Sequence, residues 1–486
     1  MRALGNNRRV LSERDGQTDA QLNRRSFLKA LGAGAVSLAL PGYVNGYQRS
    51  GSKISAGKPN FVIIFTDDQG YQDVGCFGSP HIKTPNLDRM AAEGMKFTDF
   101  YVAASVCSPS RAALLTGCYL PRVGITKVLF PRDNIGLNPK EITIADILKS
   151  RGYACACVGK WHLGHLPEFL PVNNGFDSYF GIPYSNDMDG VKDKNKNLDR
   201  AWQEKDYSPW NVPLMRNEEV IERPANQTRL IERYTTEAVK FIGNNKNKSF
   251  FLYLPHTMPH IPLFVSDEFY VEDVHKAYKA TIEQIDSSVG RILEALKEAG
   301  VDRDTLLVFT SDNGPWLGKK HHGGCALPLR DGKFSTYEGG MREPCIMRWP
   351  GKIPAREVCR ELCGTIDLLP TIAGLAGAKV PTDRVIDGRD IRSLMFGTPG
   401  AKSPHEAFFY YRGNNLEAVR TGRWKLRRSK KNIELYDLEA DISEKNNLKD
   451  KYPEIVKRLA SMMEEFDKEL KANARPAGKV SGKKKA

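Results

Sequence analysis

Residues 60–70 read NFVIIFTDDQG, an unbroken apolar run that ends in Asp67 and Asp68. Three later segments have the same form, an apolar run followed by polar side chains: YACACVGKWHLG (153–164), SFFLYLPHTMPHIP (249–262) and TLLVFTSDNG (305–314). Apolar runs of this length are typical of strands that are buried on both faces of a sheet. The sequence therefore predicts four buried strands, each with polar residues at its carboxyl end.

Helical patterns separate these strands: TPNLDRMAAEGM (84–95), EITIADILKSRG (141–152), TRLIERYTTEAVKFIG (228–243) and VHKAYKATIEQIDSSVGRILEALKEAG (274–300). This alternation predicts an α/β fold with a large, mostly parallel or mixed sheet flanked by helices. After about residue 380 the pattern changes to short aromatic and β-branched runs: HEAFFYYRG (405–413), LEAVRTGRWKLRRS (416–429) and NIELYDL (432–438). These runs predict an antiparallel meander, and residues 452–473 have the apolar periodicity of a helix.

The net charge of +14 is concentrated at the two ends of the chain. Residues 1–57 hold nine Lys and Arg against three Asp and Glu, and residues 471–486 hold six Lys and Arg with no acidic residue. The remaining 413 positions therefore carry only about +2, whereas a nucleic-acid-binding protein has its basic face on the fold itself. We expect no nucleic-acid partner.

The N-terminal region has the features of an export signal. Arg24 and Arg25 precede SFLK and a short apolar run to Leu40, which is typical of a twin-arginine signal. This predicts passage through the twin-arginine export machinery to the periplasm or the cell exterior. The run is short and rich in Gly and Ala, so we expect no membrane span in the mature protein. A disordered basic arm with an apolar helix is the alternative.

Oxygen-bearing side chains follow two of the predicted strands. Asp67 and Asp68 come after the first strand, and Asp312 and Asn313 come after the last. Ligands bind at the carboxyl ends of the strands in open α/β sheets, so these residues are expected to converge. Carboxylate and amide oxygens select a hard cation, Ca²⁺ or Mg²⁺. Either pair alone is more often a helix cap or a turn.

Cys107 begins the stretch CSPSRAALLTG (107–117), which continues as a helix with Arg111 one turn later. A thiolate at a helix N-terminus beside an arginine is a candidate nucleophile. A hard cation is nevertheless a poor partner for sulfur, which suggests that an oxygen replaces it. The nine cysteines are an odd number without paired CxxC spacing, so at least one is unpaired or modified.

Several motifs resemble those of one family over about residues 58–470: CSPSRAALLTG, GKWHLG (159–164), TPNLDRMAAEGMKFTDFY (84–101), SDNG (311–314) and GKFSTYEGGMREP (332–344). They are similar to the formylglycine-dependent sulfatases of the alkaline phosphatase superfamily. FGIPYSND (180–187) and residues 210–242 look like the branch of arylsulfatase A and N-acetylgalactosamine-6-sulfatase. The chain departs from that branch at Asn186, where a histidine is frequent, and this puts the substrate in doubt.

The resemblance implies that a formylglycine-generating enzyme oxidises Cys107 to formylglycine (3-oxoalanine), which hydrates to a diol. One hydroxyl attacks sulfur, and loss of a proton from the other expels sulfate. The resemblance also implies one bound Ca²⁺, with Mg²⁺ less favoured. It further implies that the metal ligands and the other site residues lie at the positions that match the family's motifs. The implied metal ligands are Asp67, Asp68, Asp312, Asn313 and an oxygen of residue 107. The implied sulfate-binding and proton-transfer residues are Arg111, Lys160, His162, Ser185, His260 and Lys333.

The implied roles are distinct. Arg111 and Lys160 steady the diol and the sulfuryl oxygens, and His162 takes the proton from the second hydroxyl. His260 and Lys333 hold the sulfate and protonate the leaving oxygen, while Ser185 adds a sulfate contact. The simpler alternatives, taken one by one, are a solvated Lys160, a core His162 and a surface Lys333.

The sequence leaves a second group of residues open. His256 is either a substrate contact or a loop residue. Arg330 and Glu338 flank Lys333 and could contact it without touching the substrate. Cys155 and Cys157 alternate along a predicted strand and are expected to be small buried hydrophobic residues.

Four parts of the chain follow from these patterns. We predict a signal peptide and linker at 1–57, a catalytic α/β domain at 58–379, an α+β domain at 380–472 and a basic disordered tail at 473–486. The expected substrate is a sulfated sugar or polysaccharide, with aryl sulfates also accepted. The alternatives are a phosphate or phosphonate monoester hydrolase of the same superfamily, and a non-catalytic binder of sulfated glycans with Cys107 unmodified.

Overall fold

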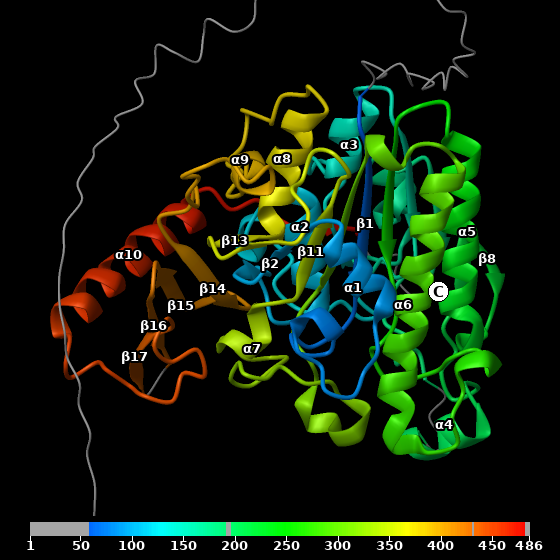
Figure 1. Ribbon diagram of the computed structural model, residues 1–486, viewed down its shortest axis with the longest axis horizontal. Helices are drawn as coiled ribbons and strands as arrows, with labels where there is room; N and C mark the ends of the chain where they lie inside the picture. The colour runs from blue at the N-terminus through cyan, green and yellow to red at the C-terminus, as the bar shows by residue number, and fades with distance from the viewer. Residues whose placement is uncertain (1–57, 191–195, 430–431, 482–486) are drawn as a thin grey trace, which may run out of the picture. The chain divides into compact units, whose positions relative to one another are not determined.

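The computed structural model describes residues 58–190, 196–429 and 432–481. They form a ten-stranded sheet with helices on both faces and a separate four-stranded sheet (Figure 1). The predicted twin-arginine signal and linker at 1–57 lie outside the described residues, as do positions 482–486 of the predicted tail. Over the described ranges, no helix is both long and apolar enough to cross a membrane.

The large sheet is mixed, as the sequence predicted. The four predicted strands lie next to one another at its centre and run parallel, in the order β10, β1, β9, β5. On one side β11 pairs antiparallel with β10, and on the other side β6 is parallel to β5 and β7 then pairs antiparallel with β6. Across the sheet the strands are β12 (Glu357–Cys359), β2 (Met95–Phe97), β11 (Cys345–Arg348), β10 (Thr305–Ser311), β1 (Asn60–Thr66), β9 (Phe250–Pro255), β5 (Ala154–Val158), β6 (Ser178–Gly181), β7 (Leu214–Arg216) and β8 (Glu219–Glu222).

Strand β1 shows why its sequence is apolar throughout. Phe61, Ile63 and Phe65 enter the hydrophobic core on one face of the sheet, and Val62 and Ile64 enter the core on the other. The first face is covered by α2 (Cys107–Thr116), α3 (Ile144–Lys149), α8 (Leu368–Leu375) and α9 (Arg392–Met395). The second face is covered by α1 (Pro85–Ala92), α4 (Leu198–Glu204), α5 (Leu230–Asn245) and α6 (Ala277–Glu298).

The predicted C-terminal meander and helix are present. The small sheet has the order β14 (Phe408–Arg412), β15 (Asn415–Thr421), β16 (Trp424–Arg428), β17 (Ile433–Asp437), and every pair is antiparallel. Helix α10 (Pro453–Ala472) packs on it through Leu459, Met463 and Leu470. Leu394 and Met395, which follow the predicted domain boundary at 380, belong to the core beneath the large sheet.

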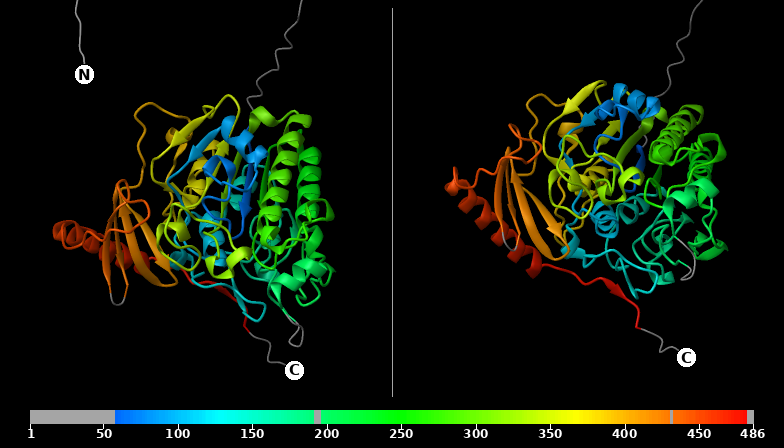
Figure 2. Two further views of the ribbon diagram at one scale, coloured as in Figure 1. Left: turned by 60° about the horizontal axis from the view of Figure 1, so that its bottom comes forward. Right: turned by 90° about the horizontal axis from the view of Figure 1, so that it is seen from below.

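Two short strand pairs and one short helix complete the fold. These are β3 (Phe100–Tyr101) with β13 (Cys363–Gly364), β4 (Ile135–Gly136) with β18 (Gly478–Lys479), and helix α7 (Glu338–Met341). Figure 2 shows the segment after α10 returning to the part of the chain that carries β4.

The predicted disordered tail is wrong for residues 473–481, because this segment is held by specific contacts. The Arg475 side chain donates to Glu141 at 2.8 and 2.9 Å, and its backbone N–H donates to the Arg122 carbonyl at 2.7 Å. The basic composition suggested a solvated tail, but one of its cations has a carboxylate partner that is 4% exposed.

Candidate active site

The ends of β1 and β10 bring four oxygen-bearing side chains together. Thr66 pairs with Ser311, so Asp67 and Asp312 leave the sheet at the same edge. The Asp68 backbone N–H donates to Asp312 Oδ1 at 3.2 Å, and Asn313 Nδ2 donates to Asp68 Oδ1 at 2.8 Å. All four side chains are buried, although three of them are acidic. The structure thus forms the cluster that the strand pattern predicted.

Helix α2 places Cys107 at its first residue and Arg111 one turn later, and all ten of its residues are buried. Arg111 Nη2 lies 2.9 Å from Asp67 Oδ2 and 2.7 Å from Asp312 Oδ2. Its Nη1 donates to the Lys160 carbonyl at 3.0 Å. One guanidinium therefore bridges both strand ends and also holds the segment after β5.

Burial raises the pKa of the Cys107 thiol to about 11, although Lys160 and Lys333 act in the opposite direction. The unmodified residue is therefore a protonated thiol at neutral pH. A helix N-terminus and nearby cations do not make it a thiolate here, because desolvation outweighs them.

Two lysines add positive charge beside the same carboxylates. Lys160 Nζ donates to Asp67 Oδ2 and, at 3.0 Å, to Ser185 Oγ. Lys333 Nζ lies 2.8 Å from the Asp68 carboxylate. Lys160 is 0% and Lys333 8% exposed, so neither is the solvated surface lysine of the simpler alternative.

Residues 59–378 match a family model described as Sulfatase. The chain belongs to the sulfatase family. Residues 330–469 match a second model, described as N-sulphoglucosamine sulphohydrolase, C-terminal.

Relatives of known activity agree with this assignment. The chain is 41% identical to arylsulfatase A of Homo sapiens over 382 residues. The alignment covers 76% of this chain and 74% of the human protein. It is 40% identical to N-acetylgalactosamine-6-sulfatase of Mus musculus over 380 residues, an alignment that covers 76% of this chain and 71% of the mouse protein. The crystal structure of Ps i-CgsB in complex with k-i-k-neocarrahexaose superposes with a TM-score of 0.74 at 32% identity, covering 84% and 93%. This sulfatase is a hydrolase of sulfuric esters.

Two histidines of the sulfatase face the cluster with defined tautomers. His162 Nε2 lies 2.9 Å from the Leu129 carbonyl, so Nε2 carries the proton and Nδ1 keeps a free lone pair. His162 Nδ1 is buried without a hydrogen-bond partner in the described structure. Burial and the charge of Lys160 hold the pKa of His162 well below its usual range. His162 is therefore a neutral base whose available atom is Nδ1.

His260 lies next to the Asp68 carboxylate. Its Nδ1 donates to the Ile261 carbonyl at 2.6 Å and lies 3.3 Å from Ser185 Oγ. Its Nε2 lies 3.7 Å from Asp68 Oδ2. A proton added to this ring would therefore reside on Nε2, next to a carboxylate that stabilises it.

The cluster fits a hard cation. Asp67 Oδ1 and Asn313 Oδ1 are buried and lack a hydrogen-bond partner among the residues that the structure describes. Burial and the charge of Asp67 also raise the pKa of Asp312 to about 7. A coordinated Ca²⁺ would give the unpartnered oxygens a partner and would offset the repulsion between the crowded carboxylates. With no thiolate involved, the donors are all oxygen atoms.

The residues that the sequence left open lie away from this cluster. His256 is buried against α6, with Nε2 3.3 Å from Ser288 Oγ. Glu338 accepts hydrogen bonds from Lys425 at 2.9 Å and Tyr410 at 3.0 Å, and Arg330 donates to the Glu444 carbonyl at 2.7 Å. Glu338 and Arg330 therefore join the large domain to the small sheet. Cys155 and Cys157 are fully buried core residues, as predicted.

Sequence analysis missed Trp316. Its ring centroid lies 5.9 Å from that of His260, and Lys333 Nζ lies 4.7 Å from it. The half-buried indole thus forms an apolar wall beside two polar site residues. Its position two residues after the SDNG motif was the available signal.

Proposed function

We propose that this sulfatase hydrolyses sulfate esters of sugars, with residue 107 converted from cysteine to formylglycine and one Ca²⁺ held by Asp67, Asp68, Asp312 and Asn313. The observation that supports this best is the setting of Cys107. It starts a buried helix among buried carboxylates and cations, and burial raises the pKa of its thiol, which disfavours the thiolate. An oxygen nucleophile at this position suits both the oxygen donors and the proposed ion.

The chemistry divides between the modification, the ion and the protein. The hydrated aldehyde would supply a hydroxyl to attack sulfur, and Ca²⁺ would offset charge on the sulfate oxygens. Arg111 orients the carboxylates through its two contacts and fixes the backbone of Lys160. Lys160 Nζ, shared between Asp67 and Ser185, is available to a sulfuryl oxygen.

Proton transfer is assigned to the two histidines. His162 Nδ1 accepts the proton of the second hydroxyl of residue 107, because this atom alone on the ring is unprotonated and without a partner in the described structure. His260 Nε2 and Lys333 Nζ both lie beside the Asp68 carboxylate, where they can bind sulfate and protonate the departing alcohol oxygen.

A sugar sulfate is the proposed substrate class. N-acetylgalactosamine-6-sulfatase is a relative that is 40% identical, and the 32% identical Ps i-CgsB was solved in complex with k-i-k-neocarrahexaose. Trp316 offers an apolar surface beside Lys333, where the non-sulfated face of a ring could pack. We also propose export by the twin-arginine route, which Arg24, Arg25 and the following apolar run support.

The modification is tested by mass spectrometry of the peptide that contains residue 107. Conversion of cysteine to formylglycine lowers its mass by roughly 18 Da and creates the electrophile that the mechanism needs. Cys107→Ala should bind a sugar sulfate but not turn it over. Unmodified Cys107 in a fully active enzyme would refute the proposal.

A paired assay tests the reaction class. The enzyme is given p-nitrophenyl sulfate and p-nitrophenyl phosphate under the same conditions, with Ca²⁺ present. We expect kcat/KM to be higher for the sulfate. A higher value for the phosphate would favour the monoester phosphatase or phosphonatase alternative, and activity on neither substrate together with binding of sulfated glycans would favour the non-catalytic binder.

A further inference from the structure

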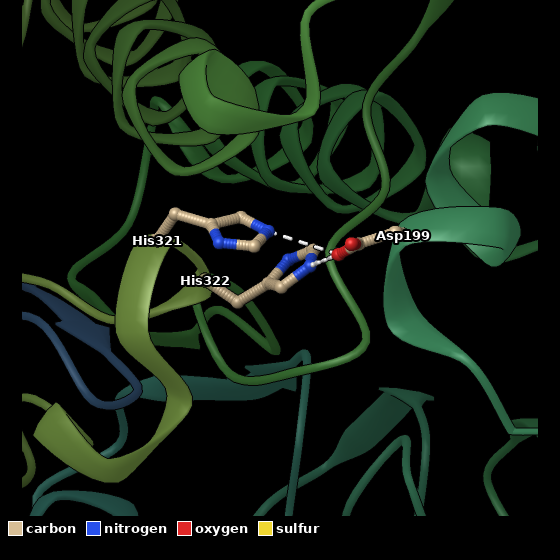
Figure 3. A group of neighbouring side chains, drawn as sticks. All are labelled: Asp199, His321 and His322. Carbon is tan, nitrogen blue, oxygen red and sulfur yellow. Dashed lines mark hydrogen bonds and ion pairs between the residues drawn. The ribbon is translucent and has the colours of Figure 1, made fainter.

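A second polar cluster lies outside the active site, where segments far apart in the sequence meet. His321 and His322 end the 3₁₀ helix η9 (Leu317–His322), and Asp199 lies in the first turn of α4. Figure 3 shows the two imidazole rings and the carboxylate pointing toward one another. None of these residues contributes to the sulfatase chemistry described above.

The three side chains already present their ligand atoms to a common point. His321 Nε2 lies 2.9 Å and His322 Nε2 lies 2.7 Å from the same oxygen, Asp199 Oδ1. The candidate ligand atoms all lie within 4.8 Å of one another. Zinc–ligand bonds of about 2.0–2.2 Å in a tetrahedral site place ligand atoms roughly 3.4 Å apart. Small side-chain rotations would therefore be enough to admit an ion.

The backbone directly before the histidines is kinked. Lys320 has φ 54° and ψ −120°, a left-handed φ that is costly for a residue with a Cβ. The kink sets the direction in which His321 and His322 continue after the turn that precedes them, so both lie on the far side of an irregular residue.

The surroundings hold the rings in place while leaving the site accessible. His322 is buried, with 4% of its side chain exposed, whereas Asp199 is about half exposed at 49%. The ring of His275, from the 3₁₀ helix η7 (Val274–Lys276), lies 4.4 Å from the ring of His321. His322 Nδ1 is buried and has no hydrogen-bond partner within the described ranges. An ion could thus enter from the exposed Asp199 side and meet the buried His322 imidazole.

We propose that Asp199, His321 and His322 bind a divalent transition-metal ion, preferentially Zn²⁺, with water in the remaining position. Two imidazole nitrogens and one carboxylate oxygen form a donor set that suits zinc, whereas Ca²⁺ and Mg²⁺ require oxygen donors. The two proposed metal sites thus differ in chemistry. This site does not depend on the proposed formylglycine mechanism.

The position of the zinc site indicates a structural role at the rim of the active site. Helix α4 belongs to the long polar segment between β6 and β7, and η9 follows directly after Trp316. A bound ion would join these two segments. Because Trp316 contacts Lys333 and His260, the ion would also limit movement of the wall beside the sulfate site.

Calorimetric titration tests the site. The full-length protein is stripped with a chelator and returned to saturating Ca²⁺, which keeps the active-site ligands occupied. Zn²⁺ is then titrated into the parent, Asp199→Asn, His321→Ala and His322→Ala, with His81→Ala as a control at an exposed histidine elsewhere. We expect one zinc per chain in the parent and the control. Each ligand variant should bind at least about tenfold more weakly.

Two further measurements separate a lost ligand from a lost fold. Zinc should raise the Tm of the parent but not that of His321→Ala, whose side chain is partly exposed and whose zinc-free Tm should match the parent. Added Co²⁺ should give the visible absorption of a low-symmetry site, and this signal should be absent from the variants. A parent that binds no zinc, or binds it equally well after His321→Ala and Asp199→Asn, would overturn the proposal. Activity with Ca²⁺ alone reports separately on the sulfatase site.

Discussion

Replacing Arg111 by alanine should destabilise the sulfatase by an amount that depends on Ca²⁺. The guanidinium is 0% exposed and contacts Asp67 at 2.9 Å and Asp312 at 2.7 Å. Its removal leaves two buried carboxylates without their shared cation. Breaking a buried ion pair in this way costs about 3–5 kcal/mol. The entropy of unfolding scales with chain length, so for a protein of this size each 0.9 kcal/mol of lost stability lowers the Tm by about 1 °C. The predicted decrease in Tm is therefore roughly 3–6 °C.

The dependence on Ca²⁺ distinguishes an effect at the proposed metal site from a general packing defect. Arg111 is a cation beside the proposed ion, so its loss should strengthen the attraction between Ca²⁺ and the carboxylates. Added Ca²⁺ should therefore restore part of the Tm that Arg111→Ala loses in chelator. Activity should remain lost, because the orienting contacts are absent.

Arg122 provides a matched control. It is also 0% exposed, and its Nη2 bridges Asp387 at 2.7 Å and Glu469 at 2.9 Å, but it contacts none of the four proposed ligands. Arg122→Ala should lose the same Tm with Ca²⁺ as with chelator, measured by differential scanning fluorimetry. If Arg111→Ala also shows an equal loss under both conditions, the reasoning about the cation site is wrong.

Two further predictions concern acid stability and leaving groups. Burial acts to raise the pKa of Glu338, but Lys425 and Arg342 lower it to about 2, below its ordinary value of 4.5. The folded state therefore gains up to about 3 kcal/mol above pH 4.5, which is lost as the pH falls toward 2. Glu338→Gln should be less stable at pH 7 and lose less stability between pH 5 and 2, measured by urea unfolding; parallel curves for variant and parent would contradict this. His260→Ala should reduce kcat more for a sugar sulfate than for an activated aryl sulfate, because a phenolate needs less acid assistance. His162→Ala should slow both substrates alike, and the reverse pattern in steady-state assays would exchange the two roles.

Most of the central fold could be predicted from the sequence because burial on both faces leaves a strong signal. The run over residues 60–66 is apolar at every position that enters a core, and its two aspartates mark the end of the strand. The order of the strands could not be predicted, but the chemistry of Asp67, Asp68, Asp312 and Asn313 pointed to two strand ends that meet, and β1 pairs with β10.

The features that were missed depend on tertiary contacts without a local pattern. Asp199 lies 122 residues from His321, in a polar segment that resembles any solvated loop. Glu338 lies in a motif with Lys333, yet its carboxylate turns toward Lys425 on the small sheet. Composition likewise suggested a free tail at Arg475, because the sequence gives no sign of its distant partner Glu141.

The pairing of β18 with β4 has a consequence for the order in which the enzyme is completed. The segment that carries β4 also includes Leu129, whose carbonyl fixes the tautomer of His162. Asn134 donates to the Val480 carbonyl, 346 residues further along the chain. Translation runs from the N-terminus, so the ribosome has made every proposed catalytic residue before it supplies this support. Until then the base can be present in the nascent chain without being held in its working orientation.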